Sequence, residues 1–445
     1  MATKGLIRLK ATAQNYDWGK RGSDSLVAVL GYAGSGIKTE QDKPYAELWV
    51  GTHPNGPSTM LSEAGTDAGS FVEWLKANPS ALGKSEDGES GLCFLFKILS
   101  IAKALSIQAH PNKKRAEELF AERPDLYKDP NHKPELACAL TEFEALLGFE
   151  RINTIVENLE STPEFRDLVA VDAGENGEKV YLGLVEAAKS EDKEVRKAAL
   201  RSFFSTFMAM DAKTVATRVE QLVKRLTGPE TVDSPLAKKE RLNDVNALAL
   251  RLHSQFPYDV GIFCSYVMCY RRLQPGEAVF LAANEPHAYL SGDCVEIMAN
   301  SDNVIRAALT PKFKDLAELE RSLTYNELPA NVGDSSGWHP CQIMKGEPRD
   351  ANTTVFYPGD PDVVEFQLER TIVKEQHVPY TFAVGSYGSI VFVTEGTGEA
   401  KWDQGMSRIP VFRGSVFFLP AGARVSVTGD IVVYRATKRG SIESA

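Results

Sequence analysis

The 445-residue chain has no apolar run long enough to cross a membrane and no excess of positive charge. No window approaches the roughly 18 consecutive apolar residues of a transmembrane helix, and residues 1–35 lack the apolar core and cleavage pattern of a signal peptide. Lys and Arg number 50 against 60 Asp and Glu, so the net charge is -10. Nucleic acids and anionic membranes require a basic surface, so we expect neither as a partner. Any anionic ligand must be bound by a local cationic pocket.

Cysteine is also sparse. The six cysteines form no Cys-x-x-Cys pair: Cys93, Cys138, Cys264, Cys269, Cys294 and Cys341. We therefore expect buried thiols rather than a disulfide framework. Apolar residues at 43% and charged residues at 25% are typical of globular proteins, which excludes disordered and fibrous classes. The composition and length predict a soluble, cytoplasmic protein of two or three domains, and we expect a monomer.

The spacing of apolar residues changes along the chain. Residues 6–147 carry short apolar runs between turn signals, which is typical of strands. From about 153 to 253 the apolar residues recur at helical spacing, and from 273 onward the runs are again strand-like. Helices are expected at 67–77, 113–122, 179–189, 193–210 and 212–226. The pattern predicts a mainly β protein with an α-helical insertion.

An internal repeat predicts two related β domains. Residues 276–297 and 414–434 both show a strand, a turn rich in Gly, Pro or Asn, an alternating strand, a Gly-Asp turn and a further strand. The pattern resembles the second motif of cupins, which are small antiparallel jelly-roll barrels, and residues 390–400 resemble the hairpin that opens such a barrel. The first copy has His287 where the second has Val425, so only the first can offer an imidazole. The predicted domains are a metal-binding cupin of 1–152 with 266–330, a helical domain of 153–265 and a metal-free cupin of 331–445.

Four side chains could form one metal site. Residues i and i+2 of a strand face the same side, so Gln108 and His110 can converge on one ion. Glu135 starts a strongly apolar segment, where a carboxylate is costly unless it is paired or binds a metal. With His287, the set offers an amide oxygen, two imidazoles and a carboxylate, which suits a divalent transition metal such as zinc. The alternative is a structural histidine beside a turn and a solvent-facing glutamate.

Six motifs in order along the chain resemble those of type I phosphomannose isomerases. They are QNYDWG (14–19), AELWVGTHP (46–54), FLFKIL (94–99), LSIQAHPNK (105–113), NHKPEL (131–136) and DNVIR (302–306). The resemblance implies a zinc-dependent aldose–ketose isomerase that interconverts mannose 6-phosphate and fructose 6-phosphate through a cis-enediol. It implies one Zn²⁺ per chain on Gln108, His110, Glu135 and His287, and an activity that feeds GDP-mannose synthesis and protein glycosylation.

Such a reaction needs a cation for the enediolate charge, a proton-transfer group and a phosphate anchor. By resemblance, Arg306 is the catalytic arginine, and Asp302, which begins the turn before it, is a further catalytic candidate. The alternative is a surface Arg306 paired with Asp302. Lys133 lies two residues before Glu135 and should share its pocket-facing side, where a nearby cation would lower its pKa and suit it to proton transfer. His132 should face the other way, and either helps to open the sugar ring or is structural.

The remaining candidates concern the substrate. Lys97 interrupts an apolar strand and should therefore point into a polar cavity. We expect Lys97, Ser106 and Lys312 to hold the phosphate. Four residues are expected to line the sugar pocket: Trp18, Glu47, Tyr289 and Glu296.

Two other functions would use part of the same residue set. A non-catalytic protein with two cupin domains that binds a sugar phosphate would keep the metal ligands but lack Lys133 and Arg306, which are both present. A cupin iron dioxygenase would use two histidines and one carboxylate with open positions for oxygen, and Gln108 as a fourth ligand disfavours it. The sequence therefore favours the isomerase.

Overall fold

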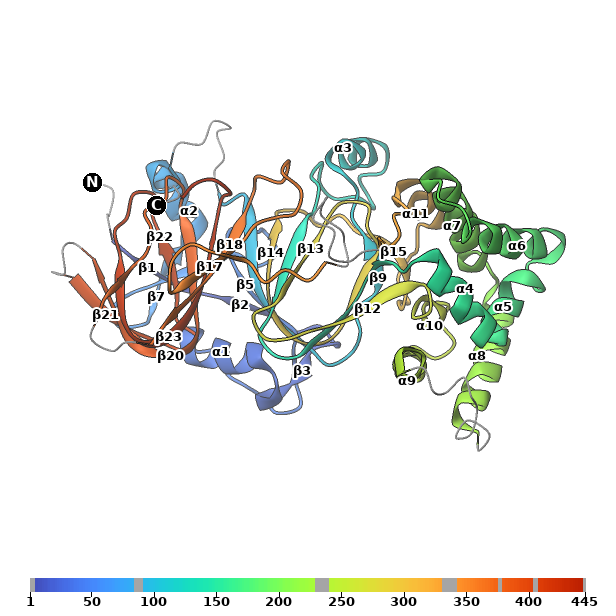
Figure 1. Cartoon of the computed structure of the whole chain (residues 1–445). Coiled ribbons are helices and arrows are strands. Elements are labelled where there is room, and N and C mark those ends of the chain that lie inside the picture. The colour runs from blue at the N-terminus through green and yellow to red at the C-terminus, as the bar shows by residue number, and fades with distance from the viewer. Residues whose placement is uncertain are drawn as a thin grey trace.

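The computed structural model describes residues 5–83, 91–228, 240–329, 342–374, 378–402 and 407–442. In this part of the chain two large antiparallel sheets stand beside each other, and a helical domain lies at one end (Figure 1). The mainly β fold with a helical insertion is thus confirmed.

The central sheet carries most of the candidate site. Its strand order is β12-β11-β14-β8-β5-β2, and β9, β10, β13 and β15 pair alongside this path. The bounds are β2 (Thr12–Gln14), β5 (Glu47–Val50), β8 (Phe94–Ile101), β9 (Ile107–Ala109), β10 (Glu135–Ala139), β11 (Phe143–Phe149), β12 (Met268–Leu273), β13 (Ala278–Leu281), β14 (His287–Ala299) and β15 (Ile305–Ala308). A separate pair is formed by β3 (Lys20–Arg21) and β4 (Pro44–Tyr45).

The second sheet joins the two ends of the chain. Its order is β16-β17-β18-β23-β20-β22-β1-β6-β7, with β19 on β23 and β21 on β20. The bounds are β1 (Ile7–Lys10), β6 (Thr59–Leu61), β7 (Asp67–Ser70), β16 (Glu347–Pro348), β17 (Thr353–Phe356), β18 (Gln367–Val373), β19 (Tyr380–Thr381), β20 (Ser389–Trp402), β21 (Ser407–Phe412), β22 (Val416–Leu419) and β23 (Ser426–Thr437). Because β1, β6 and β7 belong to it, this sheet crosses the boundary expected between 1–152 and 331–445.

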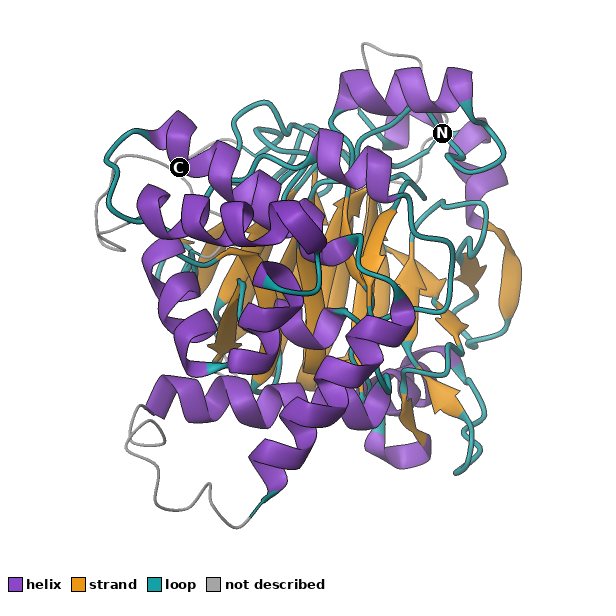
Figure 2. Cartoon of the chain, turned by 90° about the vertical axis from the view of Figure 1, so that its right-hand side faces the viewer, coloured by secondary structure: helices purple, strands orange, loops and turns teal. Residues whose placement is uncertain are grey.

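Most helices lie at the end of the molecule beyond the central sheet (Figure 2). The bounds are α1 (Leu26–Ser35), α2 (Phe71–Ala77), α3 (Lys113–Glu122), α4 (Ile152–Ser161), α5 (Pro163–Ala170), α6 (Gly177–Ala187), α7 (Lys193–Met208), α8 (Ala212–Thr227), α9 (Glu240–Gln255), α10 (Gly261–Cys264) and α11 (Leu316–Ser322), with 3₁₀ turns at Gly22–Asp24, Pro79–Ala81 and Gly174–Asn176. Four of the five expected helices agree within two residues. The fifth, expected over 67–77, begins only at Phe71, because Ser70 accepts a hydrogen bond from the Glu73 N–H as its N-cap.

The two sheets share an apolar core. Along β8, Phe94, Phe96 and Ile98 point into this core, and Phe96 stacks on Phe392 of β20 with ring centroids 5.8 Å apart. The alternate residues of β8, including Lys97, face the opposite side, where a cavity lies. Because side chains alternate along β8, one face of the strand packs in the core and the other faces the cavity.

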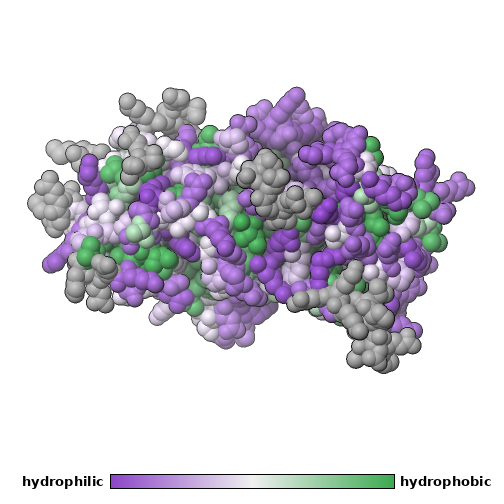
Figure 3. All heavy atoms as spheres, in the orientation of Figure 1, coloured by the Kyte–Doolittle hydropathy of each residue, from purple (hydrophilic) through white to green (hydrophobic). Residues whose placement is uncertain are grey.

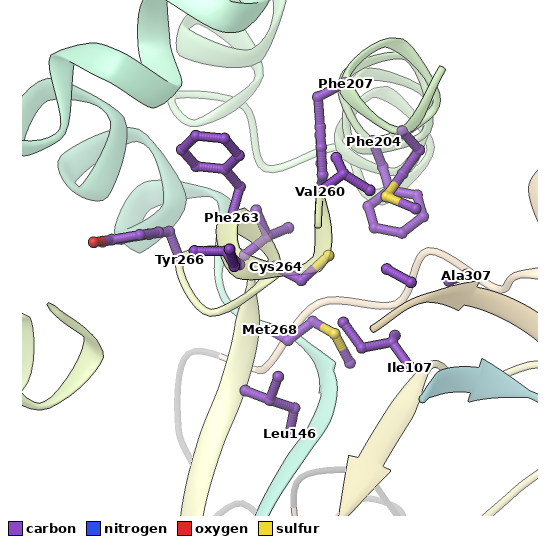
Figure 4. Packing of buried hydrophobic residues seen from close by; sticks show 14 of the residues in the cluster. Ile107, Leu146, Phe204, Phe207, Val260, Phe263, Cys264, Tyr266, Met268 and Ala307 are labelled. Atoms are coloured by element: carbon purple, nitrogen blue, oxygen red, sulfur yellow. The ribbon is translucent and has the colours of Figure 1, made fainter. Parts of the chain in front are cut away.

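The helical domain packs behind the strands that carry site residues. Its core includes Phe204 and Phe207 of α7, and it continues onto Ile107 of β9 and Ala307 of β15 (Figure 4). On the same strands, the neighbouring residues Gln108 and Arg306 line the cavity. One packed core thus fixes both strands from the side away from the site.

The remaining findings concern cysteines and the surface. Five described cysteines form no disulfide bond: Cys93, Cys138, Cys264, Cys269 and Cys294. All but Cys93 are buried, and Cys341 lies outside the described residues. Hydrophilic residues cover most of the face in Figure 3. None of the described helices combines the length and hydropathy that a bilayer-spanning segment needs.

The shared core gives a test of the packing. Phe392 is fully buried, so Phe392→Ala should lower the free energy of unfolding by about 3–5 kcal/mol, the usual cost of emptying such a site. Phe120, which is 38% exposed, provides the matched control, and Phe120→Ala should have a much smaller effect. Guanidinium unfolding followed by circular dichroism measures both; equal effects would contradict the shared core.

Candidate active site and metal centre

A cavity of about 770 Å³ opens on the central sheet, on the face away from the shared core. Side chains from β2, β5, β8, β9, β10, β14 and β15 line it, together with the segments around residues 103–106, 256 and 309–312. Its charged lining residues are Asp17, Glu47, Lys97, Lys103, Lys133, Glu135, Glu296, Asp302, Arg306 and Lys312. Carboxylates and cations thus share one concave site.

Three of the expected metal ligands lie together, and one of them, Glu135, lines the cavity. The Nε2 atom of His110 lies 3.4 Å from one oxygen of Glu135, and that of His287 lies 3.6 Å from the other. The ligand atoms of these residues all lie within 4.8 Å of one another, and none of the three residues is more than 2% exposed. In the described part of the chain, His110 Nε2, Glu135 Oε2 and His287 Nε2 are buried without a hydrogen-bond partner. Buried polar atoms are rarely left unpaired, so this cluster fits a cation.

A hydrogen bond from Nδ1 fixes the orientation of each imidazole. His110 Nδ1 donates to the Asn303 carbonyl at 2.7 Å, and His287 Nδ1 donates to the Glu285 carbonyl at 3.0 Å. A carbonyl can only accept, so each Nδ1 carries the proton and each Nε2 offers its lone pair, as metal-binding histidines require. Burial lowers the pKa of His110 to about 4, which keeps the imidazole neutral.

Gln108 completes the expected set. It lies opposite His287 of β14 on one side and Arg306 of β15 on the other, and its side chain lines the cavity. The Ser106 hydroxyl lies 3.4 Å from Gln108 Oε1. The structure therefore brings Gln108, His110, Glu135 and His287 together, and their nitrogen and oxygen donors suit a divalent transition metal.

Lysines accompany the carboxylates. Lys133 Nζ lies 3.2 Å from Glu135 Oε1, and Lys97 Nζ lies 2.9 Å from Glu296 and 3.5 Å from Glu47. Burial alone would raise the pKa of Glu135, but Lys133 and His110 hold that pKa well below its usual range. Burial would likewise lower the pKa of Lys97, but Glu296 and Glu47 raise it, so Lys97 stays charged.

The pairing of Lys97 bears on its expected role. Lys97 points into the polar cavity, as its place in β8 predicts, and it lies directly opposite Glu296 and Trp49 on the neighbouring strands. Its ammonium is 5.3 Å from the centre of the Trp49 ring. Two carboxylates already balance the Lys97 charge, so the arrangement favours orienting Glu47 and Glu296 over holding a phosphate.

Arg306 and Asp302 both line the cavity but do not pair with each other. Asp302 accepts a hydrogen bond from Asn55 at 2.9 Å and lies 3.5 Å from the His53 ring nitrogen. Arg306 forms no ion pair with any described residue, and burial lowers the pKa of its guanidinium. The alternative of a structural Arg306–Asp302 pair is therefore wrong, and the Arg306 charge faces the cavity.

His132 differs from the other candidates because it lies outside the cavity. Its Nε2 atom is 2.5 Å from Glu365, in the segment before β18 of the second sheet. The ring thus faces away from Lys133 and ties the loop before Glu135 to the C-terminal part of the chain. This contact therefore indicates a structural role for His132.

The cavity also contains residues that sequence reasoning missed. Lys103 and Phe256 line it, and so do His53 and Asn55. Lys103 stands in a short turn after β8, where it interrupts no apolar pattern, and Phe256 follows a helix more than 150 residues later. The AELWVGTHP motif, which contains His53, was the one signal available for this group.

Among its described residues, the second sheet offers no comparable donor set around Val425. That side chain is 1% exposed in an apolar cluster with Phe382, Phe417 and Val427. Among the described residues, the one group of His, Cys, Asp and Glu side chains with metal-binding spacing is His110, Glu135 and His287.

The unpartnered, preoriented donors, grouped around Glu135 beside a charged cavity, indicate a metal-dependent enzyme. Residues 6–152 match the family "phosphomannose isomerase type I, catalytic domain", and residues 177–268 match its "helical insertion domain". Mannose-6-phosphate isomerase of Bos taurus is 38% identical over 98% of this chain and 99% of its own, and that of Homo sapiens is 37% identical with the same coverage. The chain therefore belongs to the type I phosphomannose isomerases.

Solved structures agree with this assignment. The apo form of mannose 6-phosphate isomerase from Salmonella typhimurium has a TM-score of 0.76 and 28% identity, and covers 99% of this chain and 100% of its own. A zinc-bound mannose 6-phosphate isomerase has the same score and identity over 98% of this chain and 99% of its own. The likeness spans both sheets and the helical domain.

The donor geometry predicts the metal content. His287→Ala removes one of two imidazoles, so metal per chain should fall well below one after dialysis, as measured by plasma mass spectrometry. Val425→Ala, at the matching position of the repeat, should leave the content at one. A full equivalent retained by His287→Ala, or a second equivalent in the unmodified chain, would overturn the assignment.

Proposed function

We propose that this chain interconverts mannose 6-phosphate and fructose 6-phosphate through a cis-enediol, with one Zn²⁺ on Gln108, His110, Glu135 and His287. The carrying observation is that the unpartnered Nε2 atoms of His110 and His287 lie against Glu135. Glu135 in turn lines the same cavity as Lys133 and Arg306. When bound, zinc would supply a Lewis acid for the substrate oxygens. Type I family membership and the zinc-bound structural relative support the choice of substrate and metal.

Lys133 is the proposed proton carrier. In the forward direction Lys133, as the neutral amine, takes the proton from C2 of the open-chain aldose and returns it to C1, while a hydroxyl proton moves between the two oxygens. Its side chain is 11% exposed and lies within the cavity, so water competes little for the transferred proton. Glu296 is the next candidate, because burial raises the pKa of that carboxyl despite its contact with Lys97.

Arg306 is the proposed stabiliser of the enediolate. It is held on β15 opposite Gln108, and its guanidinium is half-buried without an ion pair among the described residues. A charge in such a poorly solvated place interacts strongly with negative charge on the substrate. Asp302 stands four residues earlier at the same cavity, fixed by Asn55.

The remaining predicted residues bind the substrate in this proposal. Ser106 and Lys312 bind the phosphate. Trp18 and Tyr289 line the sugar pocket, and Glu47 and Glu296 accept hydrogen bonds from the sugar hydroxyls. Lys97 stays a candidate for the phosphate, but its pairing with both glutamates supports a role in orienting them. The pocket location of all these side chains supports the assignment.

The proposal extends to architecture and setting. We propose two cupin-type jelly-roll domains, 1–152 with 266–330 and 331–445, around a helical domain of 153–265. The repeat supports this, since its first copy forms β13 and β14 and its second copy forms β22 and β23. Free cysteines are typical of a reducing compartment, which supports a cytoplasmic location. There the proposed monomer would feed GDP-mannose synthesis and protein glycosylation, without a nucleic-acid or membrane partner.

Arg306 gives the sharpest test of catalysis. Arg306→Ala should lower kcat by about 10²–10³, the range for loss of one preorganised donor, while zinc stays bound. Arg306→Lys should recover part of the rate, because it keeps the charge but loses the planar fork. A coupled assay of fructose 6-phosphate formation measures both, with the exposed Arg424→Ala as control. An unchanged kcat in Arg306→Ala would remove this role.

Lys133 is tested by hydrogen exchange. If Lys133 takes the C2 proton, Lys133→Ala should bind substrate yet exchange the substrate C2 hydrogen with deuterated solvent far more slowly, as nuclear magnetic resonance would record. Lys114→Ala, an exposed substitution on α3, should exchange at the unmodified rate. Exchange at that same rate in Lys133→Ala would place the base elsewhere, with Glu296 as the next residue to replace.

A further inference from the structure

The cations of the cavity fall into two groups. Lys97 and Lys133 are engaged by Glu296 and Glu135 at 2.9 and 3.2 Å. The other three, Lys103, Arg306 and Lys312, form no ion pair with any described residue, although all three line the same cavity. Uncompensated positive charge in a protein with a net charge of -10 is a specific feature of this part of the cavity. It suits a dianion.

Lys103 is held by the helical domain. Its backbone N–H donates to the Trp18 carbonyl at 3.1 Å, and the next N–H, of Ala104, donates to the Gln255 side chain at 2.9 Å. Its ammonium lies 4.1 Å from the centre of the Phe256 ring, and Phe256 itself lines the cavity. Gln255 is the last residue of α9, so the end of that helix fixes both the backbone and the charged head.

The same helical segment also fixes the stretch that leads to Lys312. Asp259 donates its backbone N–H to the Phe256 carbonyl at 3.2 Å, and its carboxylate accepts from the Leu309 N–H at 2.9 Å. Leu309, Thr310, Pro311 and Lys312 then line the cavity in succession. Lys103 and Lys312 thus come from two segments that residues 255–259 bind together. Ser106 lies three residues after Lys103 and completes this end.

We propose that Lys103 binds the phosphate of the substrate and that Phe256 is its positioning residue, so the helical insertion completes the phosphate end of the cavity. The inference rests on the proposed function for the identity of the phosphate ester. A free lysine side chain loses rotamer freedom when it binds an anion, and contact with an aromatic face limits that freedom beforehand. A phosphate can bind Lys103 without displacing a carboxylate, whereas at Lys97 it would have to compete with Glu47 and Glu296.

The test separates binding from chemistry. Lys103→Ala should raise KM for mannose 6-phosphate about tenfold or more and change kcat little, because the phosphate contact is the same in ground and transition states. The inhibition constant of inorganic phosphate should rise in parallel. Lys103→Arg should restore part of the affinity. Lys114→Ala removes the same charge outside the cavity and should change neither constant.

Phe256→Leu keeps an apolar side chain but removes the aromatic face. It should raise KM by about two- to tenfold, and adding it to Lys103→Ala should raise KM no further, because the two residues act through one contact. A KM and phosphate inhibition constant in Lys103→Ala equal to those of Lys114→Ala would overturn the binding role. Additive effects of the two substitutions would overturn the positioning role.

Failure of the proposed function has a different signature. If the unmodified chain does not isomerise mannose 6-phosphate, that function fails, and calorimetric titration with inorganic phosphate still tests Lys103. Weaker phosphate binding by Lys103→Ala than by Lys114→Ala would then support the anion site. Equal binding by the two variants would refute it.

Discussion

The buried carboxylate of Glu135 is the constraint on which the site depends. A carboxylate that is 2% exposed costs several kcal/mol unless it is paired or binds a metal ion, and here two imidazoles and the Lys133 ammonium stand around it. The imidazoles cannot turn to satisfy it, because the Asn303 and Glu285 carbonyls hold their Nδ1 atoms. The unpaired ligand atoms of the cluster are therefore held in an orientation that favours binding of one metal ion.

The scaffold supports that cluster from behind. Each site strand has one apolar face in a core and one polar face on the cavity, so Phe96 next to Lys97 and Ile107 next to Gln108 follow a single rule. Two different cores supply the backing: the core between the sheets lies behind β8, and the core of the helical domain lies behind β9 and β15. The metal ligands and the cationic side chains that bind the substrate can thus be held in fixed positions relative to one another, although they come from distant parts of the chain. Both packing layers are needed for this.

The sequence predicted local features well and distant pairings poorly. The donors could be predicted because each stands at a strand end or in a motif, and the orientation of Lys97 follows from alternation in β8. The membership of β1, β6 and β7 in the second sheet could not, because strand partners far apart in the chain leave no local pattern. The same holds for the side-chain partners: nothing in the spacing indicates that Glu365 meets His132 or that Phe256 meets Lys103. Such contacts depend on how distant segments pack against each other. Neither the composition nor the spacing of apolar residues indicates that packing.

The central claim is that these residues form a metal-dependent isomerase of mannose 6-phosphate. It is tested most directly by a coupled assay for fructose 6-phosphate made from mannose 6-phosphate, run on the full chain before chelation, after chelation and after zinc is returned. The account predicts activity at the start, loss of activity in step with loss of metal, and recovery when one equivalent of zinc is bound. Full activity in protein shown to be free of metal would contradict it.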